Sequence, residues 1–171
     1  MSDRSTRARI FRMEGRLTEL VVVGLLPEGV RMHNTFEGTI VDGEPAGGHV
    51  RGIDEFVIRP DGVGAIDARE VLSATAGTAY ADVLGYAHPP AGMPPPPLEV
   101  FLDPAFRWPD ARFAIECGAT YRSAAPGLGE LARTAVVHLG WVNMATRELV
   151  IEGYRASALR PDSRSAAAAA A

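Results

Sequence analysis

Apolar and polar residues alternate along short segments of the chain, and turn residues separate these segments at strand-like intervals. The segments are rich in Val, Ile, Phe, Tyr and Thr, and most of them are too short for helices. The clearest turns are Pro27-Glu28-Gly29, Asp42-Gly43, Ala46-Gly47-Gly48, Pro60-Asp61-Gly62 and Ala76-Gly77. We therefore predict an all-β fold, a small antiparallel β-barrel of about eight to ten strands with little helix, or else a β-sandwich.

The length of the chain indicates one domain, because 171 residues and 18.2 kDa are typical of a protein with a single hydrophobic core. Residues 1–7 carry charge without an apolar pattern, so we expect a disordered N-terminus. The strand pattern extends over 8–157, which we assign to the barrel. Pro161-Asp162-Ser163 interrupts it, and 158–171, which ends in a run of Ala, is expected to be a tail.

The best-defined part of the predicted sheet is a three-strand meander over 49–59, 63–74 and 78–86. In its second hairpin Ala76-Gly77 is a two-residue connection that pairs Thr75 with Thr78. Residues directly opposite each other share a face of the sheet. One face then carries Asp67, Arg69, Ser73, Tyr80, Asp82 and Tyr86, and the other carries Ile66, Ala68, Leu72, Ala79, Ala81 and Val83.

A second carboxylate accompanies Asp67 in either register of the first hairpin. A two-residue loop places Asp54 opposite Asp67, whereas a three-residue loop with a glycine bulge places Glu55 there. The polar face is either the solvated outside of the sheet or the lining of a polar lumen. We predict the lumen, with Asp67 and Arg69 pointing inward and Tyr80 and Asp54 close by, because Asp67, Arg69 and Tyr80 share a parity that a short turn sets. A buried carboxylate beside Arg and Tyr would have a shifted pKa and could move protons.

Composition excludes several classes of function. The chain has no Lys, which excludes Schiff-base chemistry and a phosphate-binding loop ending in Gly-Lys. One cysteine, Cys117, cannot form a disulfide framework, and the four His residues have no ligand spacing, so we predict neither metal nor cofactor. A net charge of −4 without a basic cluster argues against binding to nucleic acid.

With no apolar run long enough to span a membrane, we expect a cytoplasmic protein. The composition is typical of a GC-rich bacterial genome.

The segment from Pro89 to Pro97 contains six prolines, so it is neither helix nor central strand. It is expected to form a stiff loop of polyproline type. It serves either as a connector between strands or as a rim over the mouth of the barrel.

Several motifs resemble domain-of-unknown-function family 3237, also called uncharacterised protein family 0311. They are RMHNTFEG at Arg31–Gly38, Asp54 followed by IRPDG at Ile58–Gly62, IDARE at Ile66–Glu70, and Glu116-Cys117-Gly118 where the family tends to have Glu-Thr-Gly. Leu131-Ala132-Arg133 resembles the family's Leu-Asn-Arg, with Ala in place of Asn, and the proline-rich loop replaces a segment that is often helical. The resemblance covers about Arg12 to Arg155.

The resemblance implies a small antiparallel barrel that is often oligomeric, so a homo-oligomer is an open expectation. Most members have no assigned activity, while some fungal relatives are cofactor-independent cyclases of natural-product pathways, which add a hydroxyl across an alkene. This favours an isomerase or cyclase of secondary metabolism, such as polyketide metabolism, acting on a hydrophobic oxygenated molecule.

In this hypothesis Asp54 or Asp67 takes a hydroxyl proton, Arg69 and Tyr80 stabilise the enolate, and Glu116 is a reserve acid. The alternatives are a non-catalytic carrier or sensor, and a structural or oligomerisation module with a filled lumen.

Overall fold

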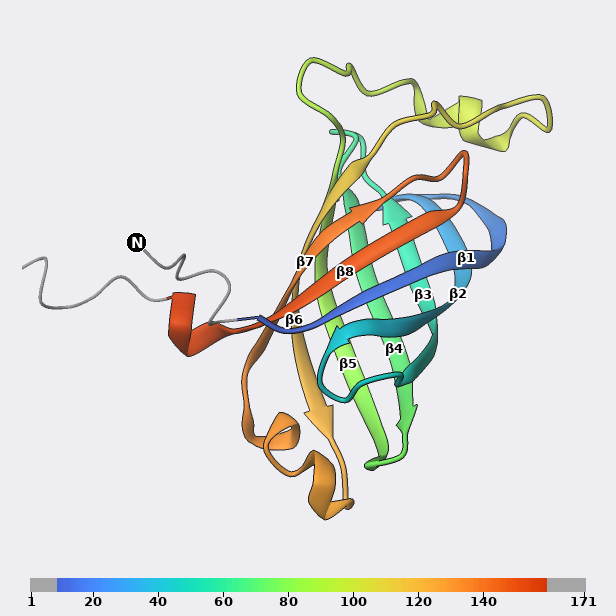
Figure 1. Cartoon of the computed structure of the whole chain (residues 1–171). Helices are drawn as coiled ribbons and strands as arrows, with labels where there is room; N and C mark the ends of the chain where they lie inside the picture. Colours follow the sequence, from blue (N-terminus) through green and yellow to red (C-terminus); the bar gives the residue numbers. More distant parts are fainter. Residues whose placement is uncertain (1–8, 160–171) are drawn as a thin grey trace, which may run out of the picture.

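A computed structural model describes residues 9–159, in which eight antiparallel strands close into a barrel (Figure 1). Each strand pairs with the next one along the chain, and β1 pairs with β8 to complete the ring. The strands are β1 (Arg9–Leu26), β2 (Gly29–Gly43), β3 (His49–Ile58), β4 (Gly64–Ala74), β5 (Gly77–His88), β6 (Phe113–Arg122), β7 (Val136–Val142) and β8 (Glu148–Arg155). The predicted all-β barrel is confirmed.

The helices of the described chain are short 3-10 turns between or after strands. They are η1 (Leu98–Leu102), η2 (Pro126–Leu128), η3 (Leu131–Arg133) and η4 (Ala156–Leu159). No helix within 9–159 has the length and apolar character needed to cross a bilayer. The expected disordered N-terminus, 1–7, lies outside the described residues, as does the expected tail, 158–171, apart from its first two residues, which belong to η4.

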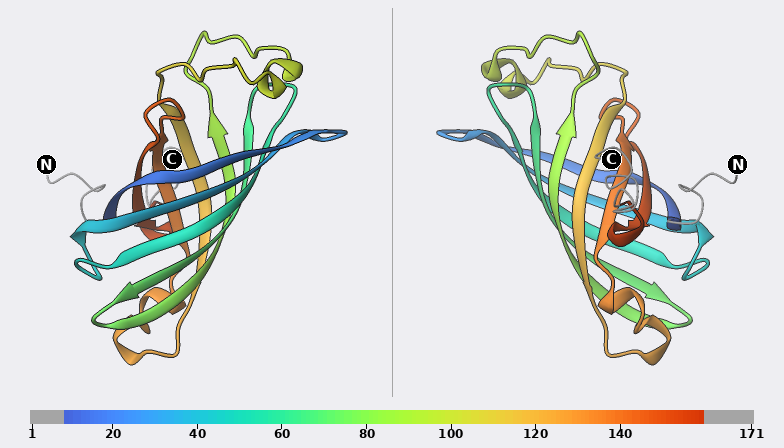
Figure 2. Two further views of the ribbon diagram at one scale, coloured as in Figure 1. Left: turned by 90° about the vertical axis from the view of Figure 1, so that its right-hand side faces the viewer. Right: turned by 90° about the vertical axis from the view of Figure 1, so that its left-hand side faces the viewer.

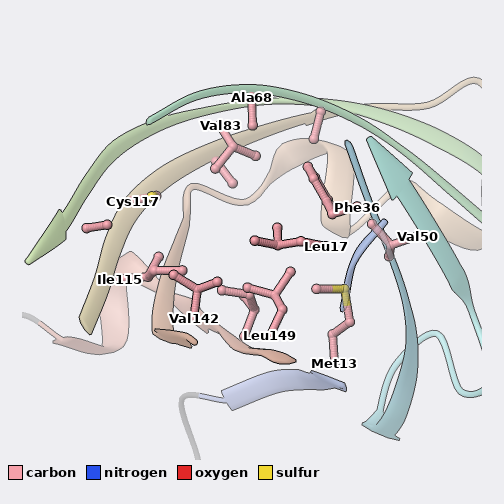
Figure 3. Packing of buried hydrophobic residues seen from close by; sticks show 14 of the residues in the cluster. Met13, Leu17, Phe36, Val50, Ala68, Val83, Ile115, Cys117, Val142 and Leu149 are labelled. Atoms are coloured by element: carbon pink, nitrogen blue, oxygen red, sulfur yellow. The ribbon is translucent and has the colours of Figure 1, made fainter. Parts of the chain in front are cut away.

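The interior is filled by every second residue of each strand. In β6, for example, Ile115, Cys117, Ala119 and Tyr121 are buried, while the residues between them are exposed. Figure 3 shows side chains from several strands, among them Leu17, Val83 and Leu149, gathered in the space that the strands enclose. An eight-stranded barrel is just wide enough for such side chains to fill it.

Glycines on the inner face make room for aromatic rings. Phe36 pairs directly with Gly52, and a Cβ on Gly52 would lie 2.5 Å from the Phe36 ring. Phe11 and Gly153 repeat this arrangement across the β1–β8 closure, where the Cβ would also lie 2.5 Å from the ring. In these pairs a large and a small residue lie side by side on neighbouring strands, so that the interior fills without clashes.

The β1–β2 hairpin extends beyond the barrel wall (Figure 2). β8 pairs with β1 only from Arg9 to Arg16, and the rest of β1 pairs with β2 alone among the described strands. This part of β1 is apolar, with exposed fractions of 39–58% for Val21, Val22, Val23, Leu25 and Leu26. Such edges can pair with other chains, and the expected homo-oligomer stays a prediction.

The turns of the meander differ in part from the predicted ones. Pro60-Asp61-Gly62 forms a three-residue loop with Gly62 at a φ of 81°, as in the second of the two predicted alternatives. In the next hairpin Ser73 pairs with Thr78, so the predicted pairing of Thr75 with Thr78 is wrong by two residues. Because a shift of two residues preserves side-chain parity, the predicted division into two faces is still correct.

The predicted inward orientation of the polar face is wrong. Ala68, Leu72, Ala79, Ala81 and Val83 are buried inside the barrel, so Asp67, Arg69 and Tyr80 point outward. The apolar face turns inward because burying several charged side chains together would cost more free energy than burying small apolar ones.

Candidate functional site

A cavity of about 280 Å³ lies at one end of the barrel, and we call it the mouth cavity. Figure 1 shows the long segment between β5 and β6 crossing this end. Prolines of the proline-rich segment line the cavity together with Met93. The segment therefore connects two strands and also forms a rim over the barrel mouth, as the second of its two interpretations predicts.

Aromatic side chains make up much of the remaining wall of the mouth cavity. The ring of Phe101 lies 4.9 Å from that of Phe106 and 5.2 Å from that of Trp108, measured between centroids. Trp108 also meets Phe113 edge-on at 6.3 Å. Arg59 is the charged residue in a lining that is otherwise apolar. The mouth cavity is thus suited to an apolar molecule of modest size.

A second cavity, of about 80 Å³, lies deeper in the barrel, and we call it the lumen cavity. Phe56, Ala87, Val142 and Met144 line both cavities, so the two are adjacent along the barrel axis. The lumen cavity differs from the mouth cavity in its polar lining. Its polar side chains are Asn34, Asp54, Glu70, Cys117 and His138.

Asp54 enters the lumen from β3, where a gap in the strand pairing holds its carboxylate. The β3–β4 pairing runs as far as Asp54 opposite Ala68 and resumes at Val57 opposite Ala65. Within this gap the backbone N–H of Asp67 donates to Asp54 Oδ1 at 3.0 Å. Burial raises the pKa of Asp54 to about 7, although the hydrogen bond from Asp67 works in the opposite direction. Asp54 can therefore accept or release a proton near neutral pH.

Glu70, Tyr121 and His138 form a buried hydrogen-bonded chain. Glu70 and Tyr121 both lie opposite Ala81, one on each side of it, and the small Ala leaves the space across which they meet. Tyr121 O–H donates to Glu70 Oε1 at 2.9 Å, and Tyr121 Oη lies 3.0 Å from His138 Nε2. Because the tyrosine proton goes to Glu70, His138 Nε2–H donates to Tyr121.

The same burial sets the charge of this chain. It raises the pKa of Glu70 to about 7 and lowers that of His138 to about 4. The pKa of Tyr121 is raised by burial and by the neighbouring Glu70. At neutral pH the imidazole and the phenol are therefore uncharged, and Glu70 is the member of the chain that titrates. Burial also raises the pKa of the Cys117 thiol to about 12, which agrees with a small core residue.

Asn34 completes the polar lining on β2. It lies directly opposite Asp54 and is only 3% exposed. Its Oδ1 has no hydrogen-bond partner among the described residues. An unpaired buried acceptor is rare in proteins, and it marks a position that a donor from elsewhere can satisfy.

The sequence-predicted site residues are thus divided between two surfaces. Asp54 lies in the lumen, whereas Asp67, Arg69, Tyr80 and Glu116 are on the outside. The outer residues of β4 and β5 form an exposed network in which Arg69 bonds Asp67 and lies 3.2 Å from Asp82, and Tyr80 donates to Asp82 at 3.0 Å. They match the solvated-surface alternative, and their side chains are not brought together with that of Asp54, which meets only the backbone of Asp67.

Arg69→Ala is expected to leave the melting temperature unchanged, because exposed ion pairs contribute little to stability. Thermal melting followed by circular dichroism checks this. A loss comparable to that of a core substitution would instead show that Arg69 supports the barrel wall.

Sequence reasoning did not identify Asn34, Glu70, Tyr121 and His138 as site residues. The sequence does contain a signal that could have identified Glu70. It lies on the same face of its strand as Ile66, Ala68 and Leu72, so a single carboxylate interrupts an otherwise apolar face. Among the described residues, no three His, Cys, Asp or Glu side chains gather in a group that could hold a metal ion.

The comparisons with known proteins show the fold alone. No family model matches the chain, and no curated protein matches it. Similar solved structures include a conserved protein of unknown function from Rhodopseudomonas palustris, with 18% identity, a TM-score of 0.66, and coverage of 86% of this chain and 95% of that one. A protein of unknown function from Clostridium acetobutylicum has 17% identity and a TM-score of 0.66, and the match covers 86% of this chain and 97% of that one. A β-barrel-like protein from Acinetobacter baumannii has 18% identity, a TM-score of 0.67, and coverage of 86% and 93%.

Proposed function

We propose that the barrel is a cofactor-independent isomerase or cyclase acting on a hydrophobic, oxygenated small molecule. One observation carries the proposal: two carboxyl groups, Asp54 and Glu70, line the cavity directly below an apolar mouth, each with a pKa raised to about 7. Acid–base catalysis is most efficient when the pKa of the catalytic group lies near the working pH. Perturbed carboxyl groups inside a cavity are a common mark of an active site.

The two carboxyl groups are placed to work on one substrate. Asp54 lies opposite Ala68, and Glu70 is two residues further along the same strand. Such diagonal neighbours have Cα atoms about 7–8 Å apart, which leaves room for a reacting group between the side chains. Near neutral pH a fraction of molecules has one carboxyl ionised and the other protonated, which provides a base and an acid.

The chemistry balances without a cofactor. Ionised Asp54 removes the proton of a substrate hydroxyl, whose oxygen adds to an alkene conjugated with a carbonyl. The C–O bond forms, the alkene π bond breaks, and protonated Glu70 delivers a proton to the resulting enolate. The product is an isomer of the substrate, and the two carboxyl groups regain their starting states by exchange with solvent. The sequence hypothesis offered Asp54 or Asp67 as the base that takes the hydroxyl proton, and here Asp54 is that base. Glu70 is the acid in place of Glu116, which faces outward.

One feature of the sequence accompanies the proposal. The motif resemblance to domain-of-unknown-function family 3237 covers both the strand of Asp54 and that of Glu70, and it supports the same chemistry. A cytoplasmic location and a role in secondary metabolism also remain parts of the proposal.

A non-catalytic carrier or sensor is the second candidate, and the Glu70–Tyr121–His138 chain favours it. These three side chains satisfy one another, so Glu70 can be retained for structure alone. A carrier binds the ligand in the same cavities but does not accelerate proton transfer.

Hydrogen–deuterium exchange of 2-tetralone, a hydrophobic ketone with acidic C–H bonds, tests the proposal. In deuterated buffer near neutral pH, wild-type protein is expected to accelerate exchange at C1 by about 100-fold or more, within the range of general base catalysis. Nuclear magnetic resonance measures the rate, and dialysis measures binding. Asp54→Asn should return the rate to that of buffer, and Glu116→Gln is the matched carboxyl control on the outer face and should retain it. Binding of 2-tetralone without acceleration would favour the carrier, and absence of binding would contradict both candidates.

A further inference from the structure

Asn34 lines the lumen cavity, and its Oδ1 is buried without a hydrogen-bond partner among the described residues. The residue is only 3% exposed, which makes an unpaired acceptor there unusual. A leucine would fill a similar volume without leaving an acceptor unpaired. Keeping an amide at this position is costly for folding, and a bound ligand that supplies a donor would remove that cost.

The surroundings of Asn34 define the donor. Its direct cross-strand partner is Asp54, so their Cβ atoms lie about 4.5–5.5 Å apart on the inner face. One oxygen of Asp54 already accepts the N–H of Asp67. The lumen cavity has no Arg in its lining, and its other side chains are mostly apolar. A neutral group that donates to Asn34 and has its heavy atom beside Asp54 fits this position.

We propose that Asn34 is the specificity-determining residue for a ligand hydroxyl: while Asp54 is protonated, Asn34 Oδ1 accepts the hydroxyl proton of an otherwise apolar molecule whose hydroxyl oxygen lies beside Asp54. When Asp54 is ionised, the same hydroxyl turns its proton to that carboxylate, which is the arrangement that the proposed proton removal requires. The location of the ligand in the two cavities rests on the proposed function. The hydroxyl preference itself does not depend on any turnover.

The depth of the site sets the shape of the ligand. Phe56 lines both cavities, and Asp54 and Asn34 lie one inward-facing position deeper. At about 3.3 Å per residue, two residues of β3 correspond to about 7 Å. A flat bicyclic ring system in the mouth cavity can place a hydroxyl at this depth, and it would pass the Phe56 ring.

Three matched probes test the proposal: naphthalene, 2-naphthol, and 2-methoxynaphthalene, which keeps the oxygen but cannot donate a hydrogen bond. Equilibrium dialysis gives the dissociation constant of each probe for wild type, Asn34→Leu and Asp54→Asn. 2-Naphthol is the most water-soluble of the three, so partition by hydrophobicity alone would make it the weakest ligand.

Wild type is expected to bind 2-naphthol about tenfold or more tightly than either other probe, as expected for a hydrogen bond to a buried acceptor. Asn34→Leu should abolish this preference while leaving naphthalene affinity within about twofold, which shows that the cavity has kept its shape. Asp54→Asn should keep the preference, because the hydroxyl still donates to Asn34.

Equal affinity of wild type for the three probes would overturn the proposal and show that the acceptor is satisfied by water only. A loss of naphthalene binding equal to the loss of 2-naphthol binding in Asn34→Leu would also overturn it, because Asn34 would then only maintain the barrel. The hydroxyl preference can hold while 2-tetralone exchange is not accelerated, in which case the proposed catalysis fails and this inference stands.

Discussion

Asp54→Asn is expected to raise the free energy of unfolding by about 2–4 kcal/mol at pH 8, while abolishing the proposed proton transfer. The pKa of Asp54 is about 7 in the folded protein, about three units above its ordinary value, and each unit corresponds to about 1.4 kcal/mol. Asparagine has nearly the same shape, and its Oδ1 can still accept the N–H of Asp67. The variant therefore loses the charge and keeps the hydrogen bond.

The sign of the effect depends on pH. Below the ordinary pKa of aspartate, Asp54 is protonated in both the folded and the unfolded chain. As the pH rises toward 7, the unfolded chain ionises first, so the stability supplied by the protonated side chain is progressively lost. The difference between Asp54→Asn and wild type should be small at pH 4 and reach its full value above pH 8.

Urea unfolding of both proteins across this pH range measures the difference. Glu70 and His138 also titrate differently in the folded and unfolded chains, but both proteins contain them, so their contributions cancel in the comparison. A pH-independent difference would mean that Asp54 is not held in its protonated form by the lumen. A gain in stability with a loss of function would be typical of a residue retained for chemistry.

The fold could be predicted from the sequence because the sequence patterns that determine its strands and turns are local. Turns such as Pro60-Asp61-Gly62 and the alternation of side chains determine strands and faces without reference to the rest of the chain. Even the two-residue error in the pairing of Thr75 left the faces intact. Which face turns inward is different, because it depends on how the inner faces of all eight strands pack together.

The candidate site could be predicted only in part for the same reason. Asp54 belongs to the meander, where local pairing already placed it near β4. The chain of Glu70, Tyr121 and His138 draws on β4, β6 and β7, and only the closed barrel brings these residues together. The spacing of these three residues along the sequence does not indicate that they are in contact.

Tyr121→Phe is expected to destabilise the protein by about 1.5–3 kcal/mol at pH 8 and by about 0.5–1.5 kcal/mol at pH 5, the ranges for hydrogen bonds to charged and neutral groups. Glu70, whose pKa is about 7, is mostly ionised at pH 8 and mostly protonated at pH 5. The hydrogen bond from Tyr121 lowers the pKa of Glu70, so its removal raises that pKa further. The penalty therefore grows as the pH rises through 7, opposite in sign to the effect of Asp54→Asn.

The matched control for this prediction is Tyr80→Phe, which removes a hydroxyl that donates to Asp82 on the exposed outer face. It should not change stability measurably at either pH. His138 does not complicate the comparison, because its pKa of about 4 keeps the folded imidazole mostly neutral from pH 5 upward. Urea unfolding of the three proteins at both pH values decides the matter. An equal penalty for Tyr121→Phe at pH 5 and pH 8 would show that the charge of Glu70 does not change in this range, and it would contradict a Glu70 pKa near 7.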